Sequence, residues 1–152
     1  MPVRLATAEG WLRVTDPTLD VFAALRPPDA TCDDAGYYVE PVTQALEIQT
    51  EVCDYLTVAQ ATLEPLAPGD VVAIRAFHYE LQAPEPGEGY LGFALDGRIE
   101  WEVHVPIPGE AEALGAEIVI DRALPAGTEM QVHVHNHGAN SWELRSVMVT
   151  PG

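Results

Sequence analysis

The sequence contains no lysine, and its seven basic residues are all arginine, against 24 aspartate and glutamate residues. The formal net charge of −17 at pH 7 disfavours nucleic acid and anionic membranes as partners, because both are negatively charged. Without lysine the chain also cannot form a Schiff base or place an ammonium group on a phosphate. Such an acidic surface suits cations, basic partners or simple solubility.

The chain also lacks long hydrophobic runs. No apolar run approaches the roughly 20 residues needed to span a bilayer, so we expect no membrane span. The first residues do not form the apolar core of a secretory signal. We expect a secreted or cell-surface protein whose signal has been removed, with a cytoplasmic protein as the alternative.

Cysteine is scarce, since Cys32 and Cys53 are the only two in the chain. They lie 21 residues apart on either side of a predicted strand, which is not a Cys-x-x-Cys arrangement. A disulfide between them would stabilise the fold by about 3 kcal/mol on the chain-entropy model. Two buried free thiols are the alternative.

Several catalytic motifs are missing as well. The only serines, Ser141 and Ser146, are not in a Gly-x-Ser-x-Gly motif, and there is no glycine-rich phosphate loop. Glu100 and Glu102 share a predicted strand face with His104, which leaves acid–base chemistry open. We therefore favour a binding protein over an enzyme.

The chain length and hydrophobic content predict one domain. With 152 residues and 47% hydrophobic content, it can bury a single core. From residue 37 onward, short segments of period two alternate with turns, which predicts an all-β antiparallel sandwich of jelly-roll type over residues 37–150. The expected strands are 46–52, 55–62, 71–81, 90–95, 98–105, 116–121, 129–136 and 141–150, with an edge strand at 10–14.

Residues 1–36 form an N-terminal extension in this scheme. Asp16 suits a helix N-cap, Pro17 suits the first helical position, and the proline pair at 27–28 ends the segment, so we expect one short helix. Residues 27–36 follow as an acidic loop. Its aspartates offer oxygen ligands for Ca²⁺, although most such loops are only solvated turns.

The clearest hairpin signal is Asp96-Gly97, which suits a two-residue turn. The resulting register places Gly92 opposite Trp101, and it puts Leu91 and other apolar residues on the face that carries His104. That mixed face indicates a covering loop, an apolar floor under a binding site, or a longer turn.

Three of the five histidines fall in residues 133–137. On a strand over 129–136, Val132 and Val134 point to the core while Gln131, His133 and His135 point to the opposite face. This pattern predicts imidazoles on a sheet surface.

Two histidines at this spacing can bind one ion. Their Cα atoms lie about 7 Å apart on a strand, so His133 and His135 can reach the same metal. The third ligand would be His104, His78 or a nearby carboxylate, and nitrogen ligands favour Zn²⁺ or Cu²⁺. The alternative is a row of histidines satisfied by carbonyls and carboxylates, and His137 alone fits a structural role.

The turn-strand pattern of residues 37–150, with Asn140-Ser141-Trp142-Glu143-Leu144 leading into the last strand, resembles the jelly-roll modules of carbohydrate-binding and lectin-like proteins. The resemblance implies that a sheet face or the end loops contact sugar. The candidate aromatics for that contact include Tyr38 and Tyr90. The residues expected to bind ligand are Tyr79, Glu102, His137, Asn140 and Trp142.

Two metalloprotein families resemble the histidine strand only in part. Gly127 followed by His133-x-His135 resembles the opening of a cupin motif, but the glutamate expected about four residues later is absent. Residues 127–144 are also similar to the closing strands of a cupredoxin, but both cysteines lie near the other end of the chain.

Three functional hypotheses follow. The first is a non-enzymatic module that binds carbohydrate, a divalent metal or both on its histidine face. The second is a self-associating structural subunit of an extracellular or particle-like assembly, with that face buried against a partner. The third is a metal-dependent enzyme of cupin type.

Overall fold

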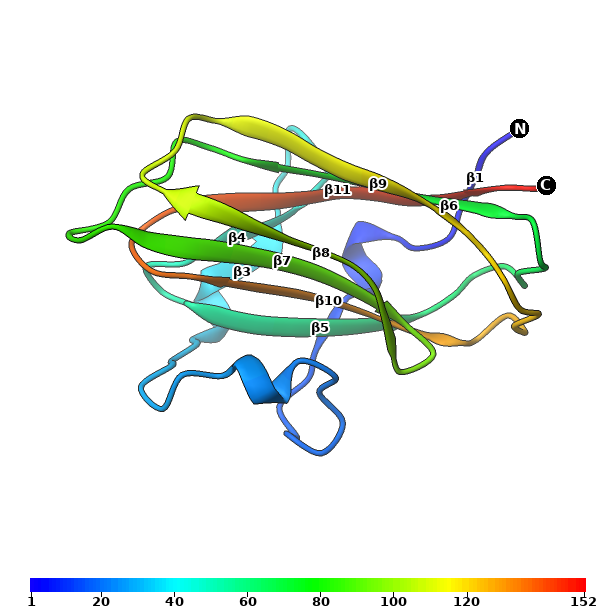
Figure 1. Ribbon diagram of the computed structural model, residues 1–152, viewed down its shortest axis with the longest axis horizontal. Coiled ribbons are helices and arrows are strands. Elements are labelled where there is room, and N and C mark those ends of the chain that lie inside the picture. Colours follow the sequence, from blue (N-terminus) through cyan, green and yellow to red (C-terminus); the bar gives the residue numbers. More distant parts are fainter.

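In the computed structural model, residues 1–152 form two antiparallel β-sheets packed face to face (Figure 1). The six-stranded sheet A has the order β3-β4-β11-β6-β9, with β1 paired to β11, and the five-stranded sheet B has the order β2-β5-β10-β7-β8. The strands of sheet A are β1 Val3–Arg4, β3 Tyr37–Val39, β4 Leu46–Gln49, β6 Val71–His78, β9 Glu112–Val119 and β11 Ser141–Thr150. Those of sheet B are β2 Leu12–Arg13, β5 Tyr55–Ala61, β7 Gly87–Leu95, β8 Arg98–Ile107 and β10 Glu129–Asn136. The predicted all-β sandwich is confirmed.

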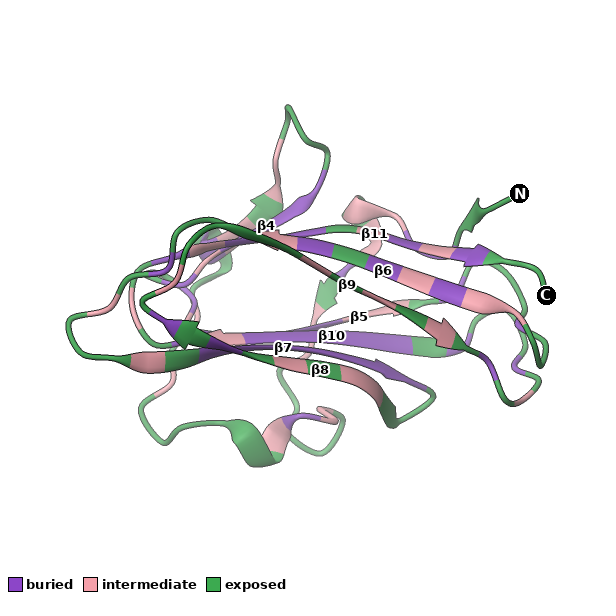
Figure 2. Cartoon of the chain, turned by 45° about the horizontal axis from the view of Figure 1, so that its top comes forward, coloured by how far each residue is buried: buried purple, intermediate pink, exposed green.

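The core lies between the sheets and follows the period-two pattern. Val72 and Ile74 of β6 face Met130, Val132 and Val134 of β10 across it, and all belong to one cluster of 27 buried residues. Figure 2 shows a second feature, since β10 is buried along nearly its whole length rather than at alternate residues. Both faces of β10 are therefore covered.

The expected helix between Asp16 and Pro28 does not form. Only one 3-10 turn is present, at Ala23–Leu25. Asp16 does accept hydrogen bonds from Thr18, but the chain then continues as separate turns. The backbone N–H of Val21 donates instead to Gln131 of sheet B, so contacts with the sheet replace the helical hydrogen bonds.

The Asp96-Gly97 turn is present, but the predicted register holds only for its first two residue pairs. A β-bulge between Phe93 and Ala94 shifts the pairing, so that Gly92 lies opposite Glu102 and Trp101 opposite Phe93. A bulge exchanges the two faces of the strand beyond it. The mixed face is thereby resolved, because Phe93 joins the core while Gly92 and Glu102 face outward.

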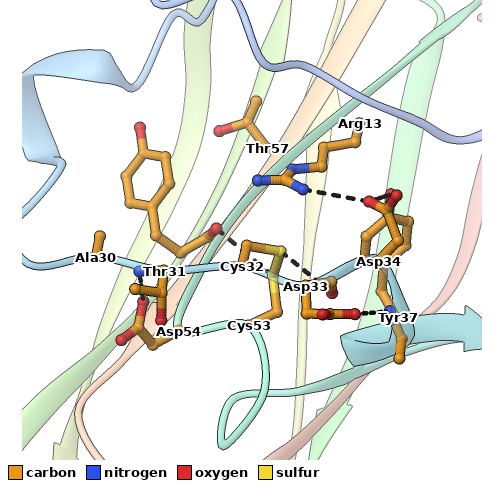
Figure 3. The surroundings of a disulfide bond; sticks show 12 residues. Arg13, Ala30, Thr31, Cys32, Asp33, Asp34, Tyr37, Cys53, Asp54 and Thr57 are labelled. Carbon is orange, nitrogen blue, oxygen red and sulfur yellow. Dashed lines mark hydrogen bonds and ion pairs between the residues drawn. A yellow bond between two sulfur atoms is a disulfide. The ribbon is translucent and has the colours of Figure 1, made fainter.

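Cys32 and Cys53 form a disulfide that fastens the end of the N-terminal extension to the start of β5 (Figure 3). In the acidic loop Asp33 accepts a hydrogen bond from Ala35 N, and Asp34 pairs with Arg13. These carboxylates are occupied by contacts within the chain, and no group of three or more acidic, histidine or cysteine side chains is arranged to hold a metal ion. The structure also contains no helix with the length and hydrophobicity required to cross a membrane.

Candidate functional site

The outer face of sheet B is partly covered by the chain itself. Residues 16–30, called here the covering segment, run below β5 and β10 in Figure 1. Gln131 holds the segment with two hydrogen bonds, because its Oε1 accepts from Val21 N at 3.0 Å and its Nε2 donates to Leu19 O at 2.7 Å. The segment therefore belongs to the folded unit and defines which part of the face stays open.

Phe22 is the apolar centre of this cover. It is 1% exposed, and its ring stacks on His133 at 5.0 Å between centroids. Gly92 of β7 makes room for it, because a Cβ at that position would lie 2.5 Å from Phe22 Cε1. The prediction that His133 lies on a sheet surface is therefore wrong. The ring does point away from the core, but it is 0% exposed.

Four polar side chains, two of them fully buried, link the covering segment to sheet B in a hydrogen-bonded series, called here the relay. His135 Nδ1 lies 2.8 Å from His133 Nε2, and His133 Nδ1 lies 2.8 Å from Thr57 Oγ1. Thr57 Oγ1 in turn donates to Asp20 Oδ1 at 3.0 Å, and Tyr55 donates to the other Asp20 oxygen at 2.7 Å. The relay connects the covering segment to the histidine strand through β5.

Burial keeps both relay histidines neutral near pH 7. Desolvation lowers the pKa of His133 well below its ordinary value of 6.5, and the neighbouring His135 lowers it further. Desolvation also lowers the pKa of His135, with a further contribution from the charge of His104, while Glu88 acts in the opposite direction. Neutral imidazoles each carry one proton, so each relay ring has one donor nitrogen and one acceptor nitrogen.

Next to the covered area the face opens into a cavity of about 270 Å³. On one side the covering segment forms its wall, and on the other side the ends of β7 and β10 form it. The lining residues are Pro27, Asp29, Ala30, Asp54, Glu88, His135, Asn136 and His137. Polar and acidic groups therefore predominate, and the cavity sits where the relay ends.

Three further predicted residues lie beside this cavity or support it. The Tyr90 ring stacks almost parallel on His135 at 4.9 Å, and its hydroxyl donates to Glu102 at 2.6 Å. His104 Nδ1 lies 2.6 Å from Glu88 Oε1. Tyr90 is fully buried, so it supports His135 rather than offering an open platform.

Four other predicted site residues lie away from the cavity. His78 is buried against Trp142 and belongs to sheet A, so it cannot join His133 at one ion. Trp142 is also a core residue, and its indole nitrogen donates to Asn136 Oδ1. Asn140 exchanges two hydrogen bonds with the backbone of residue 82. Tyr79 is exposed on the outer face of sheet A, where its hydroxyl donates to Glu143.

The relay also bears on the metal hypothesis. Both ring nitrogens of His133 already take part in hydrogen bonds, so a metal at that residue would have to break the relay. His135 is left with one nitrogen, Nε2, for any ligand. The Zn²⁺ or Cu²⁺ site, and with it the cupin-type enzyme, stays a prediction.

Sequence reasoning missed the residues that enclose this site. Thr57 could have been found, because it alternates with Tyr55 on a predicted strand and so shares its outer face. Asp20 and Phe22 gave no such signal, because the sequence predicted a helix there and did not indicate which part of the fold the helix would pack against. Glu88 lies outside the expected strand 90–95, whereas β7 already begins at Gly87.

No family model matches this sequence, and no curated protein matches it. Solved structures do match the fold. The mannan-recognising carbohydrate-binding module TmCBM27 aligns with a TM-score of 0.55 at 11% identity, over 98% of this chain and 94% of that one. The C-terminal CBM6 of LamC from Zobellia galactanivorans aligns at 0.54 with 9% identity over 99% of both chains. The xylan-binding module CBM15 aligns at 0.53 with 12% identity, over 100% of this chain and 97% of that one.

This chain has the jelly-roll fold of carbohydrate-binding modules. The predicted resemblance is thereby confirmed at the level of fold. It extends further than expected, because the alignments include the N-terminal extension as well as residues 37–150. At 9 to 12% identity the likeness concerns architecture, and the side chains of the cavity must be interpreted on their own chemistry.

Proposed function

We propose that this protein is a non-enzymatic carbohydrate-binding module whose ligand occupies the cavity between the covering segment and the ends of β7 and β10. The observation that carries the proposal is that cavity, which is lined by Glu88, Asp54, His135 and His137 on the outer face of a carbohydrate-binding-module fold. Carboxylates and imidazoles at the edge of a rigid sheet can accept and donate hydrogen bonds to several sugar hydroxyls.

The charge of the site favours a neutral or amino sugar over an acidic one. Asp29, Asp54 and Glu88 line the cavity, and the whole chain carries a formal charge of −17. A uronate or sulfated sugar would be repelled by that charge. Hydroxyl groups, in contrast, donate to carboxylate oxygens in charge-assisted hydrogen bonds. Two of the named neighbours concern mannan and xylan, and a further structure with this fold, TmCBM61 (TM-score 0.51, 13% identity), is a complex with β-1,4-galactotriose; these saccharides are the first ligands to test.

The test is affinity gel electrophoresis with soluble mannan and xylan, together with calorimetric titration of β-1,4-galactotriose. We expect retention by at least one ligand. His135→Ala and Glu88→Ala should each weaken binding by about tenfold or more, as expected when a hydrogen bond to a charged or buried group is lost. Glu117→Ala, which removes an exposed carboxylate from sheet A, is the matched control. Absence of binding to all three ligands, or equal binding by all variants, would reject the proposal.

The disulfide supports a location outside the cytoplasm, because disulfides persist in oxidising compartments. We therefore also propose a secreted or cell-surface protein. The test is cell fractionation with a tagged protein expressed from its own chromosomal locus, and recovery of that protein only from the cytoplasm would contradict the proposal. Elemental analysis of protein purified without a histidine tag tests the zinc or copper prediction separately.

The structural-subunit hypothesis loses its original basis. It assumed that the histidine face would be buried against a partner, whereas residues of the same chain, above all Phe22, bury His133. Self-association stays a prediction, and sedimentation at increasing protein concentration tests it.

A further inference from the structure

The relay has a direction that the heavy atoms determine. Asp20 accepts at both carboxylate oxygens, one from Tyr55 and one from Thr57. Thr57 has only one hydroxyl proton, which it donates to Asp20. Its oxygen can therefore only accept from His133, which must carry its proton on Nδ1.

The same reasoning extends one step further. A neutral His133 with its proton on Nδ1 has a bare Nε2, which can only accept. His135 Nδ1, 2.8 Å away, must then carry the proton that it donates to His133. His135 Nε2 is consequently bare. It makes no hydrogen bond within the chain and, unlike the nitrogen of His78, it is not buried without a partner.

We infer that Asp20, Thr57 and His133 are positioning residues that hold His135 in the Nδ1–H form, so that its bare Nε2 faces the cavity as a hydrogen-bond acceptor for the ligand. This inference rests on the proposed function. It extends that function by assigning a specificity: the ligand must present a donor to His135, as a free sugar hydroxyl or ammonium group does. An O-alkylated sugar lacks this donor at the contacting position.

The surroundings of His135 fit this assignment. The cavity wall consists largely of acceptors, since Glu88, Asp29 and Asp54 are all carboxylates. Tyr90 stacks on His135 nearly face to face, which fixes the plane of the ring and therefore the direction of its lone pair. An acceptor held rigidly in place costs little entropy to use, because it need not be ordered when ligand binds.

The relay also gives the covering segment a second role. Asp20 comes from the N-terminal extension, Thr57 from β5 and both histidines from β10. A segment more than one hundred residues away in sequence therefore sets the protonation form of the ligand contact. Replacing Asp20 by asparagine or Thr57 by valine would therefore change the ligand contact at His135, although neither residue lines the cavity.

The direct test is to record long-range ¹H–¹⁵N spectra of the histidine rings in the protein without ligand. Free imidazole prefers the Nε2–H form, so two adjacent rings in the Nδ1–H form would be a specific signature. We expect Thr57→Val, which keeps the branched side chain but removes the hydroxyl, to move both protons to Nε2. Thr57→Ser should restore the original form. Asp16→Asn is the control, because that carboxylate bonds only to Thr18.

Binding is the second readout, with soluble mannan and xylan as probes. Thr57→Val turns the acceptor of His135 into a donor, and we expect retention to fall by about tenfold, with Thr57→Ser close to the parent protein. A parent protein with His135 in the Nε2–H form, or unchanged rings in Thr57→Val, would overturn the inference. So would a proton shift that leaves binding unchanged. If the rings behave as expected but no saccharide binds, the proposed function fails while the direction of the relay stands.

Discussion

Gly92 is a residue whose missing side chain the packing requires. Glycine inside a strand ordinarily weakens it, because glycine loses more conformational freedom on folding and has no side chain to pack. Here Phe22 occupies the space above the strand, and a Cβ on Gly92 would also approach the Tyr90 ring to 2.9 Å. The usual sign of a glycine-to-alanine change should therefore be reversed.

We expect Gly92→Ala to destabilise the protein by about 1–3 kcal/mol, because overpacking must displace a buried ring. The measurement is the urea midpoint of unfolding. In a Phe22→Ala background the same change should cost less, since the closest contact is gone and only the Tyr90 ring must still shift. Additive effects of the two substitutions would show that Phe22 does not rest on Gly92.

His133 should make stability depend on pH. Its pKa in the folded state lies well below 6.5, so the unfolded chain binds the proton more readily. The stability is then fully present above about pH 6.5 and is lost as the pH falls. The loss is about 1.4 kcal/mol per pH unit until the pKa of the folded state is reached.

The measurement is the free energy of unfolding at pH 7.5, 6.5 and 5.5. His133→Gln should be less stable at every pH but should lose less on acidification, because glutamine does not titrate. His137→Gln, at an exposed loop position, should keep the slope of the parent protein. Equal slopes in all three proteins would mean that His133 is not the responsible group.

At the scale of elements, the sequence predicted β10 and β11 with their bounds, because each alternates strictly over many residues and ends at a clear turn. It failed where one residue breaks the alternation. The β-bulge in the β7–β8 hairpin places Gly92 and Trp101, predicted to be partners, on opposite faces, and no turn signal marks it. A period of two carries no information about a single inserted residue.

The helix was mispredicted for a different reason. Asp16 and Pro17 are genuine signals for the start of a helix, and Leu19 and Phe22 share a helical face. These local preferences stabilise a helix by less free energy than the covering segment gains from the burial of Phe22 and from its two hydrogen bonds to Gln131. Gln131 lies 110 residues from Val21 in the sequence. Contacts at that separation cannot be inferred from local pattern, so the sequence did not reveal that residues 16–30 cover sheet B and supply three of the eight residues that line the cavity.

At the scale of the whole molecule, the jelly roll itself was predictable, because roughly eight alternating segments between turns leave few other all-β architectures. What the sequence could not provide is which outer face stays open. That depends on how residues 16–30 are held over sheet B. Three anchors hold them: the hydrogen bonds around Gln131, those from Tyr55 and Thr57 to Asp20, and, just beyond the segment, the disulfide from Cys32 to Cys53.

The disulfide should therefore support the cavity wall as well as overall stability. Replacing Cys32 and Cys53 together by alanine removes a covalent cross-link with a sequence separation of 21 residues. The free energy of unfolding, measured by urea denaturation, should fall by about 3 kcal/mol. The wall should also loosen, so chymotrypsin should cleave after Leu25 faster than in the parent protein. Leu63, an exposed residue between β5 and β6, is the internal control, because the disulfide does not constrain it. Equal acceleration at Leu25 and Leu63 would indicate global unfolding instead, whereas selective cleavage at Leu25 would show that the bridge holds the covering segment against sheet B.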